Sequence, residues 1–176
     1  MATHQRNFQK NDEWYTPIYA VTPILKRLKP NSTVWCPFDT EKSNFVQYLK
    51  DNGFKVIHTH IDNGQDFFQQ DPPECDYIIS NPPYSLKTEV LKRVYSFDKP
   101  FALLINEQGI FDNKDRFDIF LKNGVELLVL HPRVDFITEN GNVPNKTPFQ
   151  SVYVCHRILK NQIEFETIQK RGEVCG

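Results

Sequence analysis

The sequence predicts a single α/β domain with a mostly parallel sheet that has an antiparallel edge. Three observations lead to this fold class. Short runs rich in β-branched and aromatic residues alternate with segments of helical period. The run Phe-Ala-Leu-Leu-Ile at 101–105 is apolar throughout, as a strand covered on both faces should be. The last two strand-like segments, 151–158 and 162–168, follow each other without a helix between them, which predicts the antiparallel edge.

Length and composition suit one domain. The chain has 176 residues, of which 39% are hydrophobic and 13% aromatic, and a chain of this size can bury about 70% of its unfolded surface. We expect a flexible N-terminal arm at 1–12 and a folded domain at 13–176. The net charge of −1 does not favour nucleic-acid binding, because domains that bind nucleic acid usually carry a basic excess. A local basic patch is still compatible with this charge.

The four cysteines show no paired spacing, so we expect neither a metal site nor a disulfide framework. Of the four, Cys36 and Cys155 lie within strand-like runs and should be small buried hydrophobes. No signal peptide, transit peptide or run of about 18 apolar residues is apparent, which predicts a soluble cytoplasmic protein that does not bind a membrane.

The first elements are bounded by proline and glycine. Residues 18–28 have a helix-like pattern with Pro23 in the first turns, and 29–32 end it. Residues 33–36 form the first central strand, which stops at Pro37.

The next helix opens within 38–45 and ends at Asn52-Gly53, a typical C-terminal stop. A second strand follows at 54–61 and turns at 62–64. Residues 66–68 come too soon after that turn for another helix to intervene.

The second half continues the alternation. Helical period and apolar runs predict helices at 86–97 and 115–122 and strands at 76–80, 101–105, 125–130, 151–158 and 162–168, the last as an edge. Asn140-Gly141-Asn142, with prolines at 144 and 148, predicts a mobile loop at 138–148.

The strand at 76–80 is central because it ends abruptly at Asn81-Pro82-Pro83-Tyr84. Two successive prolines cannot continue a ladder or a helix, since each fixes φ and lacks an N–H. The segment is therefore a buried strand that leads into a stiff loop at its carboxyl end, where open α/β sheets form their ligand crevice.

This loop has the groups needed to activate an amine. The Asn81 amide oxygen and the Pro82 carbonyl can accept both hydrogens of an exocyclic amine, while Tyr84 offers a flat face for a base. Two acceptors would favour the tetrahedral nitrogen that attacks a methyl donor, which is stabilisation of the transition state. A proline-rich turn that merely closes the strand is the alternative.

The nine residues from Asp76 to Tyr84 resemble the catalytic motif of amino-methyltransferases that use S-adenosylmethionine. Glu13-Trp14-Tyr15-Thr16-Pro17 resembles the Thr-Pro cofactor motif of adenine-specific DNA methyltransferases. Their order and the short chain are most similar to the small Dam-type DNA N6-adenine methyltransferases of phages and prophages, over roughly 12–157.

The resemblance implies a methyltransferase domain of the class I type, with a doubly wound sheet of about seven strands and one antiparallel hairpin member. It also implies S-adenosyl-L-methionine as cofactor, the N6 amine of adenine in DNA as substrate, a bacterial host cell as location, and Pro83 as a member of the catalytic motif.

The first strand-to-helix turn is where such sheets hold a nucleotide. Here it contains Pro37, Phe38 and Asp39 but no glycine, which departs from the glycine-rich turn usual in the family. Asp39 or Glu41 could receive the ammonium group of the cofactor. The alternative is that Asp39 only caps the following helix.

Other cofactor contacts follow from position. Asp62, after the second strand, could take both ribose hydroxyls, or could simply form a turn before Asn-Gly. Asp66-Phe67 resembles the family's Asp-Phe element near the cofactor's adenine, although Phe67 or Phe68 should belong to the core. The segment from Trp14 to Pro17 would cover the methionine end, or would only mark a helix entry with Pro17 in the first turn.

On the DNA side, the base must leave the duplex or come from a single strand to reach the loop. Tyr84 would stack the base, at about 1–3 kcal/mol. Lys87, Lys92, Arg93 and Arg133 could contact phosphates, but a solvated face is the alternative for each cation. Phe149 borders the predicted mobile loop as a base contact or, alternatively, as core.

The chain has no room for a separate recognition domain, so specificity must come from loops, a homodimer or a partner protein, or be low. Two other functions remain open. The same motif serves RNA guanine amines and protein glutamines in related amino-methyltransferases, and a glycine-free turn also suits an inactive domain of this fold that binds protein or DNA.

Overall fold

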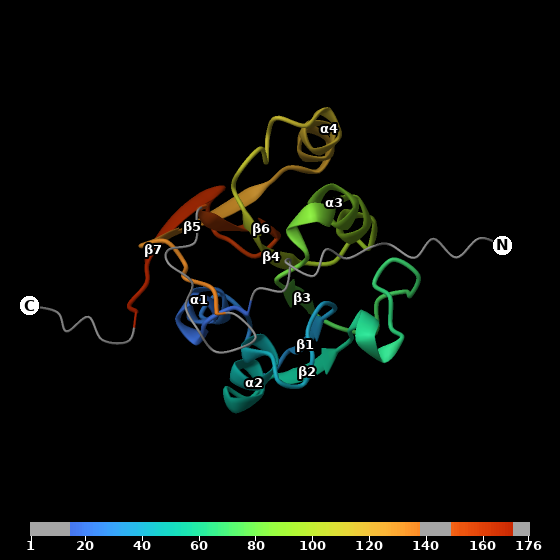
Figure 1. The fold of residues 1–176 in the computed structure, drawn as a ribbon, viewed down its shortest axis with the longest axis vertical. Helices are drawn as coiled ribbons and strands as arrows, with labels where there is room; N and C mark the ends of the chain where they lie inside the picture. Colours follow the sequence, from blue (N-terminus) through green and yellow to red (C-terminus); the bar gives the residue numbers. More distant parts are fainter. Residues whose placement is uncertain (1–14, 138–148, 171–176) are drawn as a thin grey trace, which may run out of the picture.

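The computed structural model describes residues 15–137 and 149–170. Within these ranges it forms one seven-stranded sheet in the order β2-β1-β3-β4-β6-β5-β7 (Figure 1). The strands are β1 Thr33–Cys36, β2 Lys55–His58, β3 Tyr77–Ser80, β4 Phe101–Asn106, β5 Glu126–His131, β6 Ser151–His156 and β7 Ile163–Thr167.

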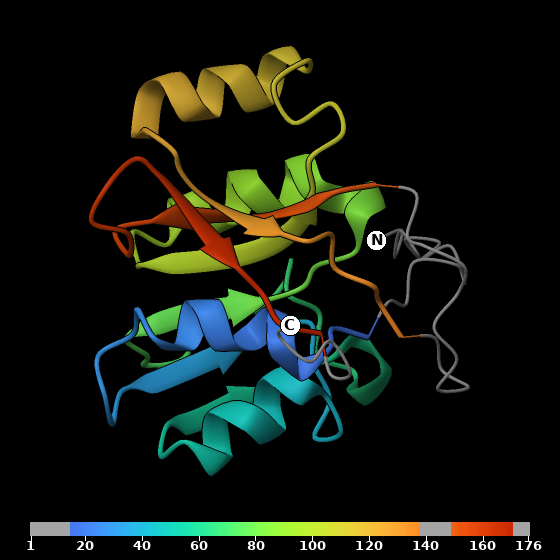
Figure 2. The same ribbon diagram turned by 90° about the vertical axis from the view of Figure 1, so that its left-hand side faces the viewer.

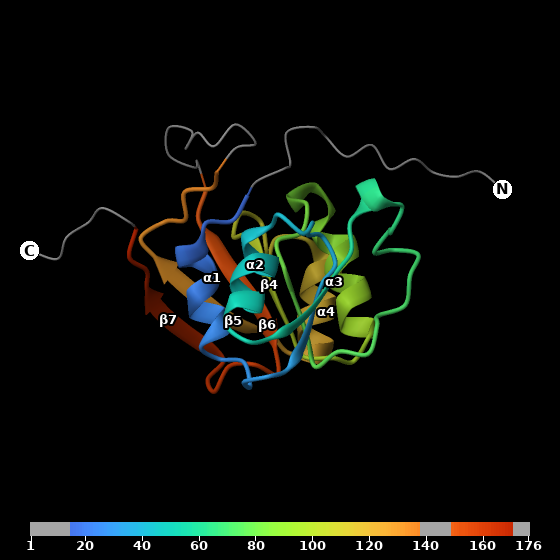
Figure 3. The same cartoon turned by 90° about the horizontal axis from the view of Figure 1, so that it is seen from below.

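Helices cover both faces of the sheet. The described α-helices are α1 Ile18–Leu25, α2 Asn44–Asp51, α3 Lys87–Ser96 and α4 Lys114–Asn123. Two short 3₁₀ helices are also described: η1 Ile61–Asn63 follows β2, and η2 Tyr84–Leu86 precedes α3. The views in Figures 2 and 3 place α1 beside α2 and α3 beside α4, on opposite sides of the strands. This arrangement, with single-domain α/β topology, confirms the predicted fold class.

The direction of the strands corrects one prediction. Four neighbouring pairs are parallel, but β6 runs antiparallel to both β4 and β5 and therefore lies inside the sheet. The segments at 151–158 and 162–168 do not pair with each other, because β5 lies between β6 and β7 and β7 is parallel to it. The predicted antiparallel edge was therefore wrong, whereas β7 is an edge as expected.

The core is built from large side chains on both faces of the sheet. Trp35, Phe45, Phe101, Phe136 and Tyr153 are among its largest fully buried members. The described cysteines are buried free thiols, which confirms the prediction that Cys36 and Cys155 are buried. Cys175 lies outside the described residues.

Local signals explain where the helices start and stop. Ser43 caps α2, and its Oγ accepts a hydrogen bond from the Phe45 amide. Asn113 caps α4 in the same way, and Gly124 follows that helix with φ 77°. Pro23 lies inside α1, where it removes one helical N–H.

No helix in the described residues is long and apolar enough to cross a membrane. The predicted N-terminal arm at 1–12 and the predicted mobile loop at 138–148 lie outside the described residues.

Candidate active site at the carboxyl edge of the sheet

Three neighbouring parallel strands end at the same edge of the sheet. β1 ends at Cys36, β3 at Ser80 and β4 at Asn106, and β6 begins at this edge with Ser151 opposite Asn106. The turn at 37–39 and the loop at 81–84 therefore emerge side by side, as predicted from the topology.

Asp39 links these two segments. Its carboxylate accepts hydrogen bonds from the hydroxyls of Ser43 and Ser80, one on each oxygen, and the residue is only 7% exposed. Burial raises the pKa of this carboxyl, while the two hydroxyl hydrogen bonds and the charges of His60 and His58 oppose the rise. The helix cap is Ser43, so the alternative in which Asp39 itself caps α2 was wrong.

The motif after β3 is packed tightly. Asn81 and Pro83 are half-buried and Pro82 is buried. The Pro83 carbonyl accepts a hydrogen bond from the Leu86 amide at 3.1 Å, which starts η2.

Tyr84 is 8% exposed, and its ring meets Phe149 edge-on at a centroid distance of 5.3 Å and Phe136 at 6.1 Å. Little of the Tyr84 ring is therefore open to solvent. Phe149 is half-buried and packs against the core, as expected if it is a core residue. Its contact with a substrate base stays a prediction.

The segment before α1 lies close to the start of α2. The Thr16 carbonyl accepts from Asn44 Nδ2 at 2.8 Å, and Pro17 is buried at the N-terminus of α1. The Thr16 hydroxyl is also buried, and it has no hydrogen-bond partner among the described residues. Tyr15 is more exposed and pairs with Ile137 through two backbone hydrogen bonds. Trp14 lies outside the described residues.

The end of β2 carries the other predicted cofactor residues. The Asp62 side chain is 71% exposed, and its Oδ2 lies 3.2 Å from His60 Nδ1. Asp66 Oδ1 accepts from the Phe68 amide at 2.9 Å, which closes a local turn.

An aromatic cluster lies next to this turn. The ring of Phe67 is buried, 4.7 Å from that of Phe38 and 5.8 Å from that of Trp35. Phe67 is therefore core, as expected for one of the two phenylalanines.

Glu41 is the second residue predicted to receive an ammonium group. It is exposed and already bonded to Lys50 Nζ at 2.7 Å and to His58 Nε2 at 2.7 Å. The hydrogen bond from Lys50 is the main cause that lowers the pKa of the Glu41 carboxyl.

Three of the side chains predicted to contact phosphates, Lys87, Lys92 and Arg93, form hydrogen bonds or ion pairs within the protein. Lys87 Nζ donates to Asn106 Oδ1 at 2.9 Å and to the Gln108 carbonyl, and burial lowers its pKa. Lys92 is paired with Asp115 at 2.7 Å.

Arg93 donates to the Phe67 and Gln70 carbonyls at 2.8 Å each and lies 5.1 Å from the Phe97 ring centroid. It therefore fixes the aromatic cluster and the loop after it, which is a structural role. Arg133 lies on the segment after β5 and is exposed, as Lys92 is.

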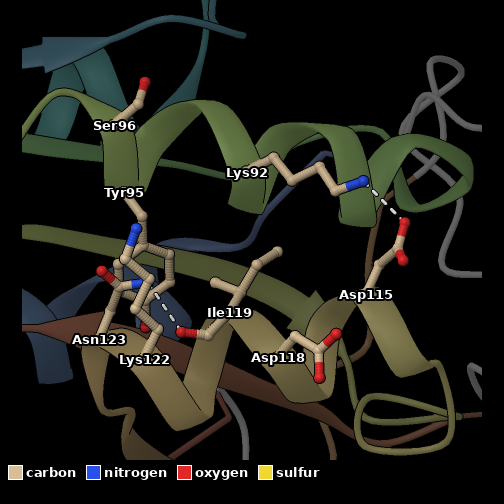
Figure 4. A pocket seen from close by; sticks show the side chains of 8 residues that line it. All are labelled: Lys92, Tyr95, Ser96, Asp115, Asp118, Ile119, Lys122 and Asn123. Carbon is tan, nitrogen blue, oxygen red and sulfur yellow. Dashed lines mark hydrogen bonds and ion pairs between the residues drawn. The ribbon is translucent and has the colours of Figure 1, made fainter.

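A hollow between α3 and α4 is a separate feature. Figure 4 shows its lining from these two helices, including Lys92, Tyr95, Asp115 and Ile119. None of the motif residues at the carboxyl edge lines it.

Sequence reasoning missed the two serines that bind Asp39. Ser80 directly precedes Asn81, and Ser43 follows Asp39 by four residues. A serine at the end of a central strand was the available signal, but only the three-dimensional register brings it to Asp39.

Comparison with known proteins gives one relative in sequence and several in fold. No protein-family model matches the chain. A bifunctional methyltransferase of Rickettsia prowazekii is 30% identical over 103 residues, which is 57% of this chain. The chain spans 18% of the length of that relative.

Two solved structures resemble the fold. A modification subunit of a putative type I restriction enzyme from Vibrio vulnificus superposes with a TM-score of 0.50 at 13% identity, over 84% of this chain and 45% of that one. A TehB-like SAM-dependent methyltransferase from Corynebacterium glutamicum gives 0.49 at 11% identity, over 78% of this chain and 85% of that one. The first likeness shows that the two chains share a fold.

Proposed function

We propose that this protein transfers a methyl group from S-adenosyl-L-methionine to the N6 amine of adenine in DNA. The observation that carries the proposal is the position of Asn81-Pro82-Pro83-Tyr84. This motif follows the central strand β3 at the carboxyl edge, directly beside the first turn after β1. The sequence relative with methyltransferase in its name supports methyl transfer, and the fold shared with a restriction-enzyme modification subunit is compatible with DNA as substrate.

The carboxyl edge fits the cofactor. The Thr16 hydroxyl, buried without a partner in the described part of the chain, is a polar group that a ligand can satisfy. Asp62, after β2, would accept hydrogen bonds from the ribose hydroxyls, and Asp66 would lie near the adenine. The ring of Phe38 is half-buried beside Phe67 and offers an apolar surface for the adenine. These residues would hold S-adenosylmethionine, which supplies a methyl group on a positively charged sulfur.

Asn81 and Pro82 would act on the substrate amine. The amide oxygen and the proline carbonyl accept one amine hydrogen each, so the nitrogen lone pair leaves conjugation with the ring and becomes nucleophilic. Because these acceptors are held on a loop with two prolines, they need little reorganisation when charge develops on the nitrogen.

Tyr84 would hold the base once Phe149 has moved aside. Both rings lie at the same edge as Asn81. If a base replaced Phe149 beside Tyr84, Tyr84 would still have an aromatic partner.

Two measurements test the proposal. We expect host DNA to gain N6-methyladenine, detected by mass spectrometry, after expression of the protein, and to gain none with Asn81→Ala. Both proteins should bind S-adenosylmethionine in calorimetry, because Asn81 acts on the substrate. Asn161→Ala, at the exposed turn before β7, is the matched control and should methylate normally.

Undiminished methylation by Asn81→Ala would remove this residue from the mechanism. Methylated RNA or protein glutamine in place of methyladenine would change the substrate, and the absence of saturable heat with cofactor would favour an inactive binding domain.

A further inference from the structure

Asp39 is a buried carboxyl whose described partners are neutral hydroxyls. In the described part of the chain no lysine or arginine forms an ion pair with it, and its two oxygens are taken by Ser43 and Ser80. Burial of a carboxylate without an ion pair to a lysine or arginine is costly, which suggests that Asp39 has a specific role.

The hydrogen bonds around Asp39 form a continuous chain. The Phe45 amide donates to Ser43 Oγ at 3.2 Å, and the Ser43 hydroxyl donates to Asp39. On the other side the hydroxyl of the fully buried Ser80 donates to the second oxygen of Asp39. The chain therefore runs from the first turn of α2 to the residue directly before Asn81.

The hydrogen bond between Asp39 and Ser80 lies beyond the end of the backbone ladder between β1 and β3. The register between β1 and β3 pairs Val34 with Tyr77 and Trp35 with Ile78, and no later pair follows. Ser80 lies two residues further along β3. The bond between the Asp39 and Ser80 side chains therefore connects β1 and β3 beyond their last backbone pair.

On the other side of β3, the ladder with β4 ends at Ser80, which is opposite Leu103. Asn81 is thus the first residue outside the ladder. Ser80, the last residue of the ladder, and the two prolines that follow restrict the backbone of Asn81. We propose that Asp39 is a positioning residue that holds Ser80, and through Ser80 the Asn81 amide, against the turn after β1.

The inference rests on the proposed function and changes the role of Asp39 within it. As a direct ligand, Asp39 would receive the cofactor ammonium through its negative charge. As a positioning residue, it acts through hydrogen bonds that a neutral amide can also make. An asparagine at this site can accept one serine hydroxyl and donate to the oxygen of the other.

Four variants separate the two roles. We expect Ser80→Ala and Asp39→Ala each to lower kcat for DNA methylation by roughly tenfold to a hundredfold, the effect of a lost hydrogen bond to a charged group. The double variant should lose no more than the worse single one, because both break the same contact. Asp39→Asn should keep kcat within several-fold of the parent, and calorimetry should show an unchanged Kd for S-adenosylmethionine in all four.

A rise of tenfold or more in the cofactor Kd of Asp39→Asn, with Ser80→Ala unaffected in kcat, would overturn the proposal and make Asp39 a ligand. Hydrogen exchange separates this failure from failure of the proposed function. Ser80→Ala should speed exchange at the Asn81 and Tyr84 amides even if the protein methylates nothing, and unchanged exchange there would refute the positioning role.

Discussion

Replacing Thr16 with valine should stabilise the cofactor-free protein and weaken its cofactor binding at the same time. The change keeps the shape of the side chain and removes a hydroxyl that is buried, in a residue 5% exposed, without a partner in the described ranges. An unsatisfied buried polar group costs about 1–3 kcal/mol. We therefore expect the free energy of unfolding to rise by at least about 1 kcal/mol, or about 2–4 °C in Tm for a domain of this size.

Binding should change in the opposite direction. If the Thr16 hydroxyl bonds the cofactor, its loss should raise the Kd for S-adenosylmethionine by roughly tenfold, the equivalent of about 1.4 kcal/mol. Urea unfolding without cofactor measures the first effect, and calorimetry measures the second.

The matched control is Thr22→Val on α1. The Thr22 hydroxyl donates to the Ile18 carbonyl at 3.2 Å and lies 3.3 Å from the Tyr48 hydroxyl, so its removal should destabilise slightly and leave cofactor binding unchanged. A Thr16→Val protein that is less stable than its parent, or that binds cofactor equally well, would refute the reasoning.

Two further predictions follow from buried groups at the same edge. Phe67→Ala should lower the free energy of unfolding by about 3–5 kcal/mol in urea titrations, because the ring is buried against Trp35, Phe38 and Phe97; a loss below about 1 kcal/mol would contradict that packing. Asp39→Asn should change how stability depends on pH. Because burial raises the pKa of Asp39 in the folded state, its contribution is largest in acid and declines as pH rises from the ordinary aspartate range through the raised value. The stability of the parent relative to the variant should therefore fall over that window, and a relative gain with rising pH would contradict the raised pKa.

Much of the fold follows from local sequence signals. Pro37 ends β1, Asn81-Pro82 ends β3, and Gly124 ends α4, so the boundaries of these elements were readable within a few residues. The position of β6 inside the sheet, in contrast, could not be predicted from local signals. Which neighbours a strand pairs with depends on long-range contacts, and the apolar run at 152–155 within β6 suits an interior strand of either direction.

The sequence predicted where the candidate site residues lie better than it predicted which residues they contact. The sequence placed Asp39 and Asn81 at one edge because both follow central strands. It could not show that Asp39 binds Ser80, because that contact depends on how far each strand extends beyond the shared ladder. The hydrogen-bond partners of Lys87 and Arg93 within the protein could not be predicted either, because they come from segments distant in sequence.

The absence of glycine from the turn after β1 has a structural explanation. Glycine is required where a turn needs positive φ or a very close backbone approach. Residues 37–43 separate β1 from α2, and among the described residues none of these seven positions has positive φ. The connection is a wide loop, closed by the bond from the Ser43 amide to the Thr40 carbonyl at 3.0 Å and by the Ser43 hydroxyl on Asp39. Side-chain hydrogen bonds thus shape this loop where a tight turn would depend on glycine. The departure from the glycine-rich pattern is therefore compatible with a ligand site at this edge, and the role of Asp39 in that site is structural support.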